Sequence, residues 1–190
     1  MLQFSKKDKG LNMKIYNTRP ENNEGRLEKE IRCYDFLDKI GVKYSRIDHE
    51  AAMSMEACRE IDEKLGTTIC KNLFLCNRQK TDFYLLMMPG NKNFRTSSVS
   101  SQIGTSRLSF GDPGDMLTLL DLTPGSVSVL GLMNDKEGRV RLVIDRDVLS
   151  GDWVGCHPCI NTTSLRIATS DLRDKIIPAL GHTPTIITIE

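Results

Sequence analysis

The sequence predicts an α+β fold, with a mixed and largely antiparallel sheet flanked by helices. Helical segments and short apolar strands alternate irregularly along the 190 residues, and several strands follow one another with only a turn between them. Regular alternation of strand and helix would instead favour a doubly wound α/β fold. The sequence has no internal repeat, and a chain of this length suits one compact domain.

The first half of the chain predicts two helices, a strand and a hairpin. Apolar residues recur at helical spacing in the helices, Gly41 and Gly66 are placed to end them, and Ser54 is placed to cap the second. A polar loop separates two apolar runs, and this pattern predicts a β-hairpin. The predicted elements are a helix over residues 24–40, a strand over 42–47, a helix over 54–66 and hairpin strands over 69–76 and 83–88.

The second half predicts two more helices and further strands. Asp112 and Pro113 begin one helix, because aspartate caps well and proline fits the first turn. Ser170 caps the last helix, which Pro178 and Gly181 end. The other predicted elements are a weak helix over residues 96–101, a strand over 107–110, a hairpin of strands 130–133 and 139–144, and strands over 164–168 and 185–189.

Composition predicts a soluble, cytoplasmic protein. The 26 basic and 25 acidic residues give a formal charge of +1, which argues against binding polyanions over the whole surface. No apolar run has the length of a signal peptide or of a membrane span, so no membrane partner is expected. Cys33, Cys70 and Cys76 fall in apolar patterns, where free cysteine packs as a small hydrophobe, and this favours a reduced, intracellular chain.

Residues 1–23 are predicted to form a flexible basic extension that precedes a domain of residues 24–190. The extension contains five basic and two acidic residues and ends in a polar run. This composition is typical of an unstructured tail, and a basic arm that touches RNA phosphates is the alternative.

Cys156-His-Pro-Cys159 is the most conspicuous local motif, because such a pair can be a redox couple or half of a zinc site. A tetrahedral zinc site needs a second pair of ligands, and the sequence offers no other motif of that kind. A thioredoxin-like site needs a helix after its first cysteine, whereas here a strand follows. Phosphate-binding glycine loops and serine-hydrolase elbows are also absent from the sequence. We therefore expect no metal and no cofactor.

Three features are each open to two interpretations. Lys71 interrupts an apolar strand, so its ammonium group either reaches solvent or points into a cleft. The segment Pro124-Gly-Ser-Val-Ser128 is either a plain connection or a loop whose free amides hold a carbonyl oxygen. His157, held by the following proline, either satisfies loop carbonyls or acts near neutral pH. For His49 and His182 the structural interpretation is favoured.

Taken in order along the chain, these motifs resemble the YbaK/ProX family of aminoacyl-tRNA editing domains, in particular its ProX branch of prolyl-tRNA synthetase associated proteins. The resemblance extends from about Leu27 to Ile189. It is carried by Lys71-Asn-Leu-Phe-Leu75, Tyr84-Leu-Leu-Met-Met-Pro89, Thr123-Pro-Gly-Ser-Val-Ser128, Gly131-Leu-Met-Asn-Asp135, Val143-Ile-Asp145, His157-Pro158 with Asn161-Thr162, and Gly181-His182.

The resemblance implies a trans-editing enzyme that hydrolyses the ester of a small amino acid mischarged onto tRNA, in the first place alanine on proline tRNA. A synthetase pocket built for proline cannot strongly reject alanine, since lost methylenes are worth only about 1–3 kcal/mol, so a second sieve is needed. The implied partners are mischarged tRNA and prolyl-tRNA synthetase. No covalent nucleophile is implied, because water attacks the ester with help from the tRNA's terminal ribose hydroxyl.

The resemblance also implies the roles of individual residues. Lys71 orients the aminoacyl end, the loop amides stabilise the oxyanion, and His157 belongs to the pocket. The implied catalytic residues are Lys71, Gly125, Ser126, Val127, Ser128 and His157, and the implied substrate-binding residues are Asn72, Val129, Asn161 and Thr162.

The sequence departs from the family pattern at the pocket. Val129 stands where the Gly-x-x-x-Pro loop has proline, which bears on loop rigidity and on selection by size. Cys156 and Cys159 stand beside His157 where an aromatic residue and an asparagine are expected. Two alternatives follow: a non-catalytic module of the same fold that binds tRNA or synthetase, and a thiol redox protein that uses Cys156 and Cys159 and requires a depressed thiol pKa.

Overall fold

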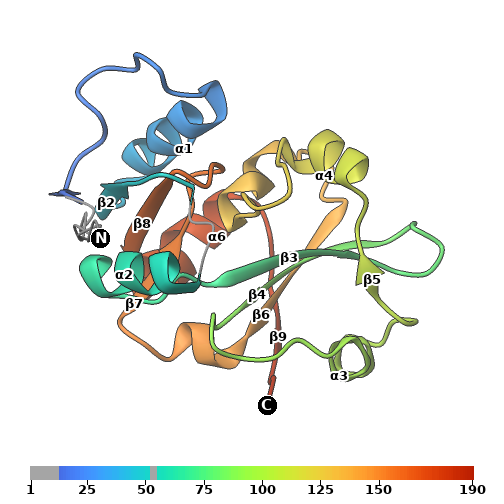
Figure 1. The fold of residues 1–190 in the computed structure, drawn as a ribbon. Coiled ribbons are helices and arrows are strands. Elements are labelled where there is room, and N and C mark those ends of the chain that lie inside the picture. Colours follow the sequence, from blue (N-terminus) through green and yellow to red (C-terminus); the bar gives the residue numbers. More distant parts are fainter. Residues whose placement is uncertain (1–12, 52–54) are drawn as a thin grey trace, which may run out of the picture.

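Two β-sheets share one core in the computed structural model, which describes residues 13–51 and 55–190 (Figure 1). The first sheet is antiparallel throughout. In spatial order its strands are β1 (Ile15–Tyr16), β2 (Tyr44–Asp48), β8 (Thr163–Ala168) and β7 (Trp153–Cys156).

The second sheet mixes strand directions. Its first three strands are antiparallel neighbours, and each of its last two is parallel to the strand before it. The predicted α+β class with largely antiparallel pairing is confirmed, although the strands form two sheets. In spatial order the second sheet contains β5 (Ser109–Phe110), β3 (Lys71–Cys76), β4 (Phe83–Met88), β6 (Val140–Asp145) and β9 (Thr185–Ile187).

Strands β3 and β4 form the predicted hairpin and pair along their whole lengths. Asn77 organises the loop between them. Its Oδ1 accepts a hydrogen bond from the N–H of Thr81 at 2.9 Å, and its Nδ2 donates to Asp82 at 2.7 Å. All six residues of β4 are buried, as expected for a central strand with both faces covered.

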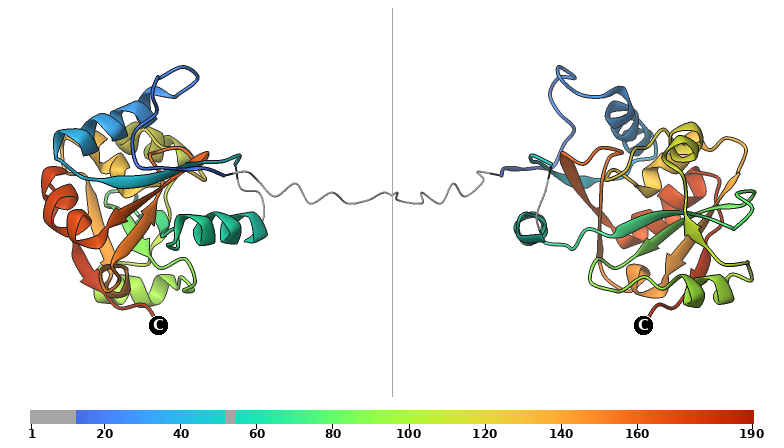
Figure 2. Two further views of the ribbon diagram at one scale, coloured as in Figure 1. Left: turned by 90° about the vertical axis from the view of Figure 1, so that its left-hand side faces the viewer. Right: turned by 45° about the vertical axis from the view of Figure 1, so that its right-hand side comes forward.

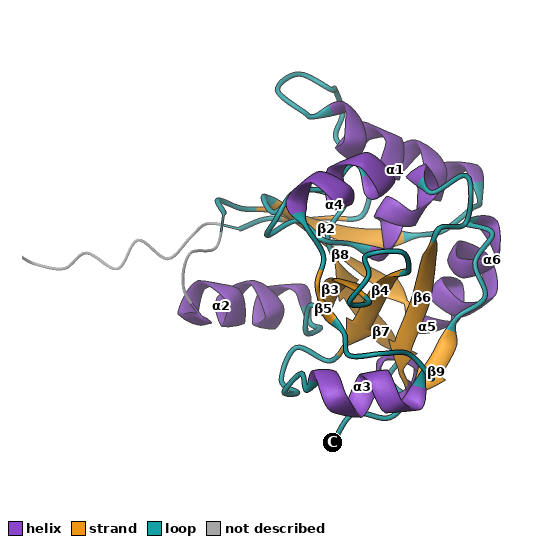
Figure 3. Cartoon of the chain, turned by 90° about the vertical axis from the view of Figure 1, so that its right-hand side faces the viewer, coloured by secondary structure: helices purple, strands orange, loops and turns teal. Residues whose placement is uncertain are grey.

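Helices surround the sheets on several sides (Figures 2 and 3). Asp112 caps one helix, as predicted, by accepting a hydrogen bond from the N–H of Gly114 at 2.8 Å. Another helix ends before Gly41, whose φ of 66° is open to glycine without strain. Within the described residues, no helix is long and apolar enough to cross a lipid bilayer. These helices are α1 (Glu28–Lys39), α2 (Met55–Leu65), α3 (Thr96–Gln102) and α4 (Pro113–Leu120).

The last helix is irregular and contains a π turn. Proline lacks an N–H group, so Pro178 cannot complete the regular bonding of the preceding turn, and a wider turn forms there. The cap position is Ala168, which makes no side-chain hydrogen bond, so the predicted cap Ser170 is wrong. The three parts are α5 (Thr169–Asp171), the π turn η3 (Leu172–Ile176) and α6 (Ile177–Ala179).

The predicted hairpin between residues 130–133 and 139–144 is wrong. The first run forms a 3-10 helix, η1 (Val129–Asn134), whose cap Ser128 accepts a hydrogen bond from the N–H of Leu130 at 3.2 Å. The second run forms β6, which pairs with β4 and β9 instead. A short apolar run suits a buried strand and a buried helical turn equally well, and here the serine cap favours the helix.

Smaller differences concern short elements. Helix α3 is better formed than the weak helix predicted, and β5 covers only part of the predicted strand 107–110. Strand β7 and the 3-10 turn η2 (Arg146–Leu149) were not predicted. Gly155 in β7 lies so close to the neighbouring chain that a Cβ there would come within 2.8 Å of the Ile69 Cα. The predicted cap Ser54 lies outside the described residues.

The main core lies between the two sheets. Val154 and Cys156 of β7 pack there with Phe74 and Leu85 of the second sheet, and α1, α4 and the last helix close its sides. A second cluster joins the other face of the second sheet to α3 through Val99. A third joins β2 to α2. The first sheet is therefore packed against helix α2 on the face that points away from the main core.

The predicted N-terminal extension is attached to the domain in its described part. Met13 is buried, β1 pairs with β2, and the Arg46 guanidinium lies 4.3 Å from the centre of the Tyr16 ring. Residues 13–16 therefore add a strand to the first sheet, in contrast to the flexible segment expected there. Residues 1–12 lie outside the described part, and the domain boundary at residue 24 stays a prediction.

Candidate functional site

Two connecting segments lie side by side at one end of the first sheet. The glycine loop (residues 123–128) joins α4 to η1, and the hairpin tip (residues 157–162) joins β7 to β8. Ser128 Oγ donates a hydrogen bond to the carbonyl oxygen of His157 at 2.5 Å. A Cβ atom on Gly125 would lie 3.7 Å from Nδ2 of Asn161. The fold thus brings together two segments that are far apart in the sequence.

The two serine hydroxyls of the glycine loop hold the loop in shape. Ser126 Oγ donates to the carbonyl oxygen of Thr123 at 2.9 Å and accepts from the N–H of Thr123 at 3.3 Å. Ser128 Oγ donates to His157 and accepts from Leu130. Both residues are buried. Within the described residues neither hydroxyl is hydrogen-bonded to a histidine nitrogen or a carboxylate, so neither has there the general base that a serine nucleophile needs.

The backbone of the glycine loop offers free donors. The N–H groups of Gly125, Val127 and Ser128 make no hydrogen bond to any described residue. Gly125 has a φ of 88°, a conformation in which other residues are strained, and it is exposed. Preorganised amides of this kind can donate to a carbonyl oxygen as negative charge develops on it.

His157 has a fixed orientation and is neutral. Its Nδ1 donates a hydrogen bond to the carbonyl oxygen of Thr163 at 2.9 Å, so the lone pair is on Nε2. Burial lowers the pKa of His157 below its ordinary value of 6.5, and the hydrogen bond to Thr163 offsets only part of that effect. No described residue forms a hydrogen bond with Nε2, which is therefore available to accept a proton or a hydrogen bond.

A second histidine, His49, lies beside the first. The two ring centres are 6.4 Å apart, and Ser164 lies between them, with its Oγ 2.8 Å from His49 Nε2 and 3.5 Å from His157 Nδ1. Nδ1 of His49 is 2.8 Å from the carbonyl oxygen of Glu50, so it donates there and Nε2 accepts from Ser164. The sequence favoured a structural role for His49, because nothing in it shows that β2 pairs with β8.

A buried network of charges lies next to the histidines. Arg26 contacts Glu30 at 2.6 Å and Asp48 at 2.7 Å, and Arg46 also pairs with Asp48. Thr163 Oγ1 donates to Asp48 at 3.0 Å. Burial raises the pKa of Asp48, but the hydrogen bonds from both arginines outweigh it and leave that pKa well below its ordinary value. The network fixes Thr163, whose carbonyl oxygen in turn orients His157.

Lys71 and Asn72 approach the site from the second sheet. A parallel bridge joins Ile69 to Gly155, and Lys71 and His157 each lie two residues beyond it in the same direction. The Lys71 side chain is exposed, and its Nζ donates to the carbonyl oxygen of Lys92 at 2.9 Å. It makes no hydrogen bond to the glycine loop or the hairpin tip within the described residues. The backbone positions are thus neighbours, whereas the ammonium group points elsewhere.

The remaining predicted residues divide between surface and core. Asn161 and Thr162 are exposed on the hairpin tip, and the carbonyl oxygen of Thr162 accepts a hydrogen bond from the N–H of His49 at 2.9 Å. The side-chain Oδ1 of Asn72 is buried and has no hydrogen-bond partner. Val129 is 1% exposed and packs in the main core. The Val129 side chain therefore does not line the exposed part of the site.

Two cysteines, Cys156 at the end of β7 and Cys159 in the hairpin tip, are buried. The Sγ atom of Cys159 lies 3.4 Å from that of Cys33. Burial raises the pKa of Cys156 well above its ordinary value, whereas a reactive thiol needs a lowered one. The raised pKa of Cys156 does not support the alternative of a Cys156/Cys159 thiol redox protein, which required a depressed thiol pKa. The described residues contain no cluster of three or more side chains suited to a metal ion.

Comparisons with known proteins give the family. Residues 49–175 match the model of the aminoacyl-tRNA editing domain. The chain is 30% identical over 147 residues to the prolyl-tRNA editing protein ProX of Acetoanaerobium sticklandii, with 77% of this chain and 89% of that protein covered. It is 26% identical over 166 residues to prolyl-tRNA synthetase associated domain-containing protein 1 of Danio rerio, with 86% and 88% covered.

Solved structures show the same fold. A crystal structure of a protein named as a candidate trans-editing enzyme for prolyl-tRNA synthetase superposes with a TM-score of 0.64 at 15% identity, over 86% of this chain and 98% of that one. The resemblance to the YbaK/ProX family found in the sequence is confirmed. The chain belongs to the aminoacyl-tRNA editing family and is an aminoacyl-tRNA deacylase, an enzyme that hydrolyses the ester bond of mischarged tRNA.

Proposed function

We propose that this deacylase acts in trans on proline tRNA that carries alanine. The relative that is 30% identical is a prolyl-tRNA editing protein, which supports proline tRNA as the substrate. The observation that carries the chemistry is the contact between the glycine loop, which has free amides, and the backbone of His157, whose imidazole is neutral. Ester hydrolysis needs these two functions, a donor for the oxyanion and an acceptor for the proton of water.

In the proposed reaction the ester carbonyl oxygen lies on the glycine loop. The amides of Gly125 and Val127 donate to this oxygen and stabilise the negative charge of the tetrahedral intermediate. A water molecule attacks the carbonyl carbon while Nε2 of His157 accepts its proton. Collapse of the intermediate breaks the bond to the ribose oxygen, which takes up the proton. The products are free alanine and uncharged tRNA.

Lys71 is proposed to bind the aminoacyl end of the tRNA. The Lys71 ammonium group has no carboxylate partner among the described residues, and its only hydrogen bond there is to the Lys92 carbonyl oxygen. A long, exposed lysine side chain exchanges such a bond easily for one to phosphate or ribose. Lys71 and His157 each follow by two residues the bridge that joins Ile69 to Gly155, and this supports a role at the same substrate.

Asn72, Asn161 and Thr162 are proposed to contact the amino acid or the terminal ribose. Asn161 and Thr162 are exposed beside the glycine loop. The buried Oδ1 of Asn72 has no partner, so it is able to accept a hydrogen bond from a donor that the substrate brings. Val129 is proposed to act on selection by size through the rigidity of the loop, because its side chain is buried in the core.

A deacylation panel tests the proposal. Purified enzyme is mixed with tRNA charged with alanine, serine, cysteine or threonine, and with correctly charged proline tRNA as the species to be spared. We expect alanine on proline tRNA to be hydrolysed fastest and Lys71→Ala to be strongly impaired. Lys136→Ala is the matched control, because Lys136 is an exposed lysine on a turn away from the glycine loop.

The panel has two outcomes that contradict the proposal. Alanine left on proline tRNA at enzyme excess, with Lys71→Ala indistinguishable from wild type, would remove this substrate. Retained tRNA binding without deacylation of any charged species would favour a non-catalytic binding module of the same fold.

A further inference from the structure

Trp153 is an exposed tryptophan at the edge of the first sheet. It begins β7, the outermost strand on that side, and is 48% exposed. The guanidinium carbon of Arg166, on the neighbouring strand, lies 4.7 Å from the centre of the Trp153 ring. Indole and guanidinium together form a flat surface, here called the Trp153 platform. The exposed part of the indole offers an apolar face on which a planar group can stack.

Arg166 has no counter-charge. Among the described residues it forms no ion pair, and its buried Nε has no hydrogen-bond partner. The guanidinium group of Arg166 lies close to the end of α2. Its Nη1 atom would be 2.8 Å from a Cβ atom placed on Gly66. A partly buried cation without a carboxylate favours an anion beside it, and guanidinium groups suit phosphate in particular.

A cavity of about 310 Å³ adjoins the indole ring. Trp153 forms part of its wall, Thr68 and Asn91 are polar residues of its lining, and Cys70 and Pro89 are less polar ones. The volume is at the lower end of the range for pockets that hold small organic ligands, roughly 300–1,000 Å³. A flat ring fits such a space, with hydroxyl and amide groups at its edge for hydrogen bonds.

The platform lies on the same side of β7 as the editing site. Val154 and Cys156 point into the main core, so Trp153 points to the opposite face. His157 lies near Ser164, with 3.5 Å between Nδ1 and Oγ, and Ser164 shares a face of β8 with Arg166 because Leu165 between them is in the core. Four residues of extended chain separate Trp153 and His157, a distance of about 13 Å. Arg166 pairs with Gly155, midway between them. The unpaired end of a tRNA advances at least about 3.4 Å per nucleotide, so a few nucleotides span this distance.

We propose that the Trp153 platform and its cavity bind the unpaired nucleotides that precede the aminoacylated adenosine of tRNA. A base stacks on the Trp153 ring and enters the cavity, and Arg166 contacts a backbone phosphate. Single-stranded RNA is held in this way by aromatic rings and arginine groups. The inference rests on the proposed function, because the direction of the strand is set by an ester bound at the glycine loop.

Intrinsic fluorescence tests the platform directly, because Trp153 is the only tryptophan in the chain. The wild-type protein is titrated with the RNA trinucleotide CCA and with a trinucleotide of the same backbone that lacks bases. We expect saturable quenching by CCA and none by the abasic trinucleotide at equal concentration. Absence of quenching by CCA under conditions in which a labelled tRNA acceptor hairpin binds would overturn the inference.

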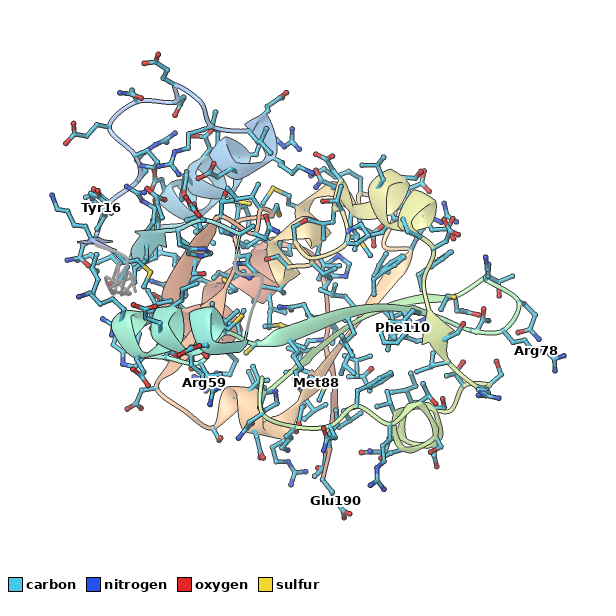
Figure 4. The ribbon with its side chains drawn as sticks, viewed as in Figure 1. Tyr16, Arg59, Arg78, Met88, Phe110 and Glu190 are labelled. Carbon is cyan, nitrogen blue, oxygen red and sulfur yellow. The ribbon has the colours of Figure 1, made fainter. Side chains whose placement is uncertain are left out.

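Variants separate stacking from charge. Trp153→Ala should weaken binding of the labelled acceptor hairpin about 5- to 150-fold, and Trp153→Phe should restore most of it. Arg166→Gln should lower the slope of log K against log salt concentration by about one. The control is Phe110→Ala. Phe110 is 63% exposed on β5 of the second sheet, to the right of Arg59 on α2 in Figure 4.

The same variants distinguish failure of the inference from failure of the proposed function. Trp153→Ala that deacylates alanine from proline tRNA with unchanged KM and kcat overturns the platform and leaves the proposed function standing. Quenching by CCA together with weak binding by Trp153→Ala, in a protein that deacylates none of the charged tRNAs, supports the platform and removes the proposed function. A raised KM with kcat nearly unchanged in Trp153→Ala supports both.

Discussion

The end of the first sheet that carries the candidate site buries polar and charged side chains, whereas the centre of the second sheet buries apolar and aromatic ones. Around the histidines, β2 and β8 bury an arginine, a threonine and a serine, and α1 adds the buried Glu30. In the second sheet, all six residues of β4 are apolar or aromatic and buried. Both regions are well packed, but only the first offers groups that move protons or hold charge.

This difference separates the residues that stabilise the fold from the residues that can take part in the reaction. Burial of apolar side chains stabilises the second sheet without regard to direction. The buried charges near His157 are stabilising only while each has its partner, because an unpaired buried charge is costly. Substitutions of the buried apolar residues of β4 should therefore affect folding alone, whereas substitutions beside the histidines should affect activity, pH dependence or both.

The largest effect is expected for His157→Gln. Loss of a general base lowers kcat/KM about 100- to 10,000-fold, and stability should change little because the side chain is partly exposed. In the wild type, burial lowers the pKa of His157 below 6.5, so the group stays unprotonated under mildly acidic conditions. Activity should therefore persist below pH 6.5 and fall only as the pH drops through the lowered pKa. Deacylation rates over a pH series measure both.

His182→Gln is the control for that variant. His182 lies near Asp135, with 3.9 Å between Nε2 and Oδ2, and lines a different cavity from the Trp153 platform. Its replacement should leave the pH profile as it is. Equal losses in the two histidine variants would show that His157 acts through stability and not as a proton acceptor.

Leu86→Ala should have the largest effect on stability. Leu86 is fully buried in β4 and packs on the side of the second sheet that faces α3. Truncation of a buried leucine costs about 2–5 kcal/mol of the free energy of unfolding. Urea unfolding measures this loss, and kcat per folded molecule should equal that of the wild type. A lower kcat in the folded fraction would contradict the division between the two sheets.

Asp48→Asn should lower both the free energy of unfolding and kcat, by smaller amounts than Leu86→Ala and His157→Gln respectively. Hydrogen bonds from Arg26 and Arg46 lower the pKa of Asp48, so its contribution to stability is present above the ordinary pKa of 3.8 and is lost as pH falls toward the lowered value. Loss of charge-assisted hydrogen bonds should cost about 1–3 kcal/mol at pH 7. Urea midpoints of variant and wild type should converge below pH 3.8.

The exposed carboxylate Asp174 provides the comparison for Asp48. It pairs with Arg173 on the surface, and such pairs contribute little. Asp174→Asn should leave the urea midpoint unchanged at both pH values. Asp48→Asn should also lower kcat, because Asp48 holds Thr163 and Thr163 orients His157. Unchanged activity would mean that the backbone alone fixes Thr163.

The sequence predicted the strands and helices whose pattern is local, and failed where pairing at long range decides. The hairpin of β3 and β4 and the cap of α4 were found, because alternation and capping are written in neighbouring residues. The run at 130–133 was assigned to a strand, because four residues of this kind do not distinguish a strand from a turn of helix. Strand β7 was missed, since it is short and contains glycine.

The same division applies to the residues of the site, where motifs along the sequence identified some and pairing at long range decided the others. The glycine loop and His157 were selected by the order of motifs, and the structure places them in contact. His49 was set aside because only the pairing of β2 with β8 brings it to Ser164. Trp153 and Arg166 were not singled out at all. A lone tryptophan and a lone arginine have no local pattern, and their proximity depends on the register of β7 and β8.

The smallest effect is expected for Val129→Pro, which restores the residue of the family loop. Val129 is the first residue of η1, where the N–H is unpaired in any helix and proline is well tolerated. A residue before proline must be extended, and Ser128 already is, with φ −147° and ψ 146°. The free energy of unfolding should therefore change by less than about 1 kcal/mol, with the stiffer loop offsetting the lost packing of the valine.

The same substitution tests how size selection works. Since the Val129 side chain is in the core, proline there changes the stiffness of the glycine loop and not the lining of the pocket. We expect the ratio of kcat/KM for alanine over serine to rise a few-fold, because a stiffer loop adapts less to the larger side chain. Val127→Pro makes the contrast: it removes one of the free N–H donors, so kcat should fall for every amino acid. An unchanged ratio in Val129→Pro, with the fold intact, would place size selection in the hairpin tip instead.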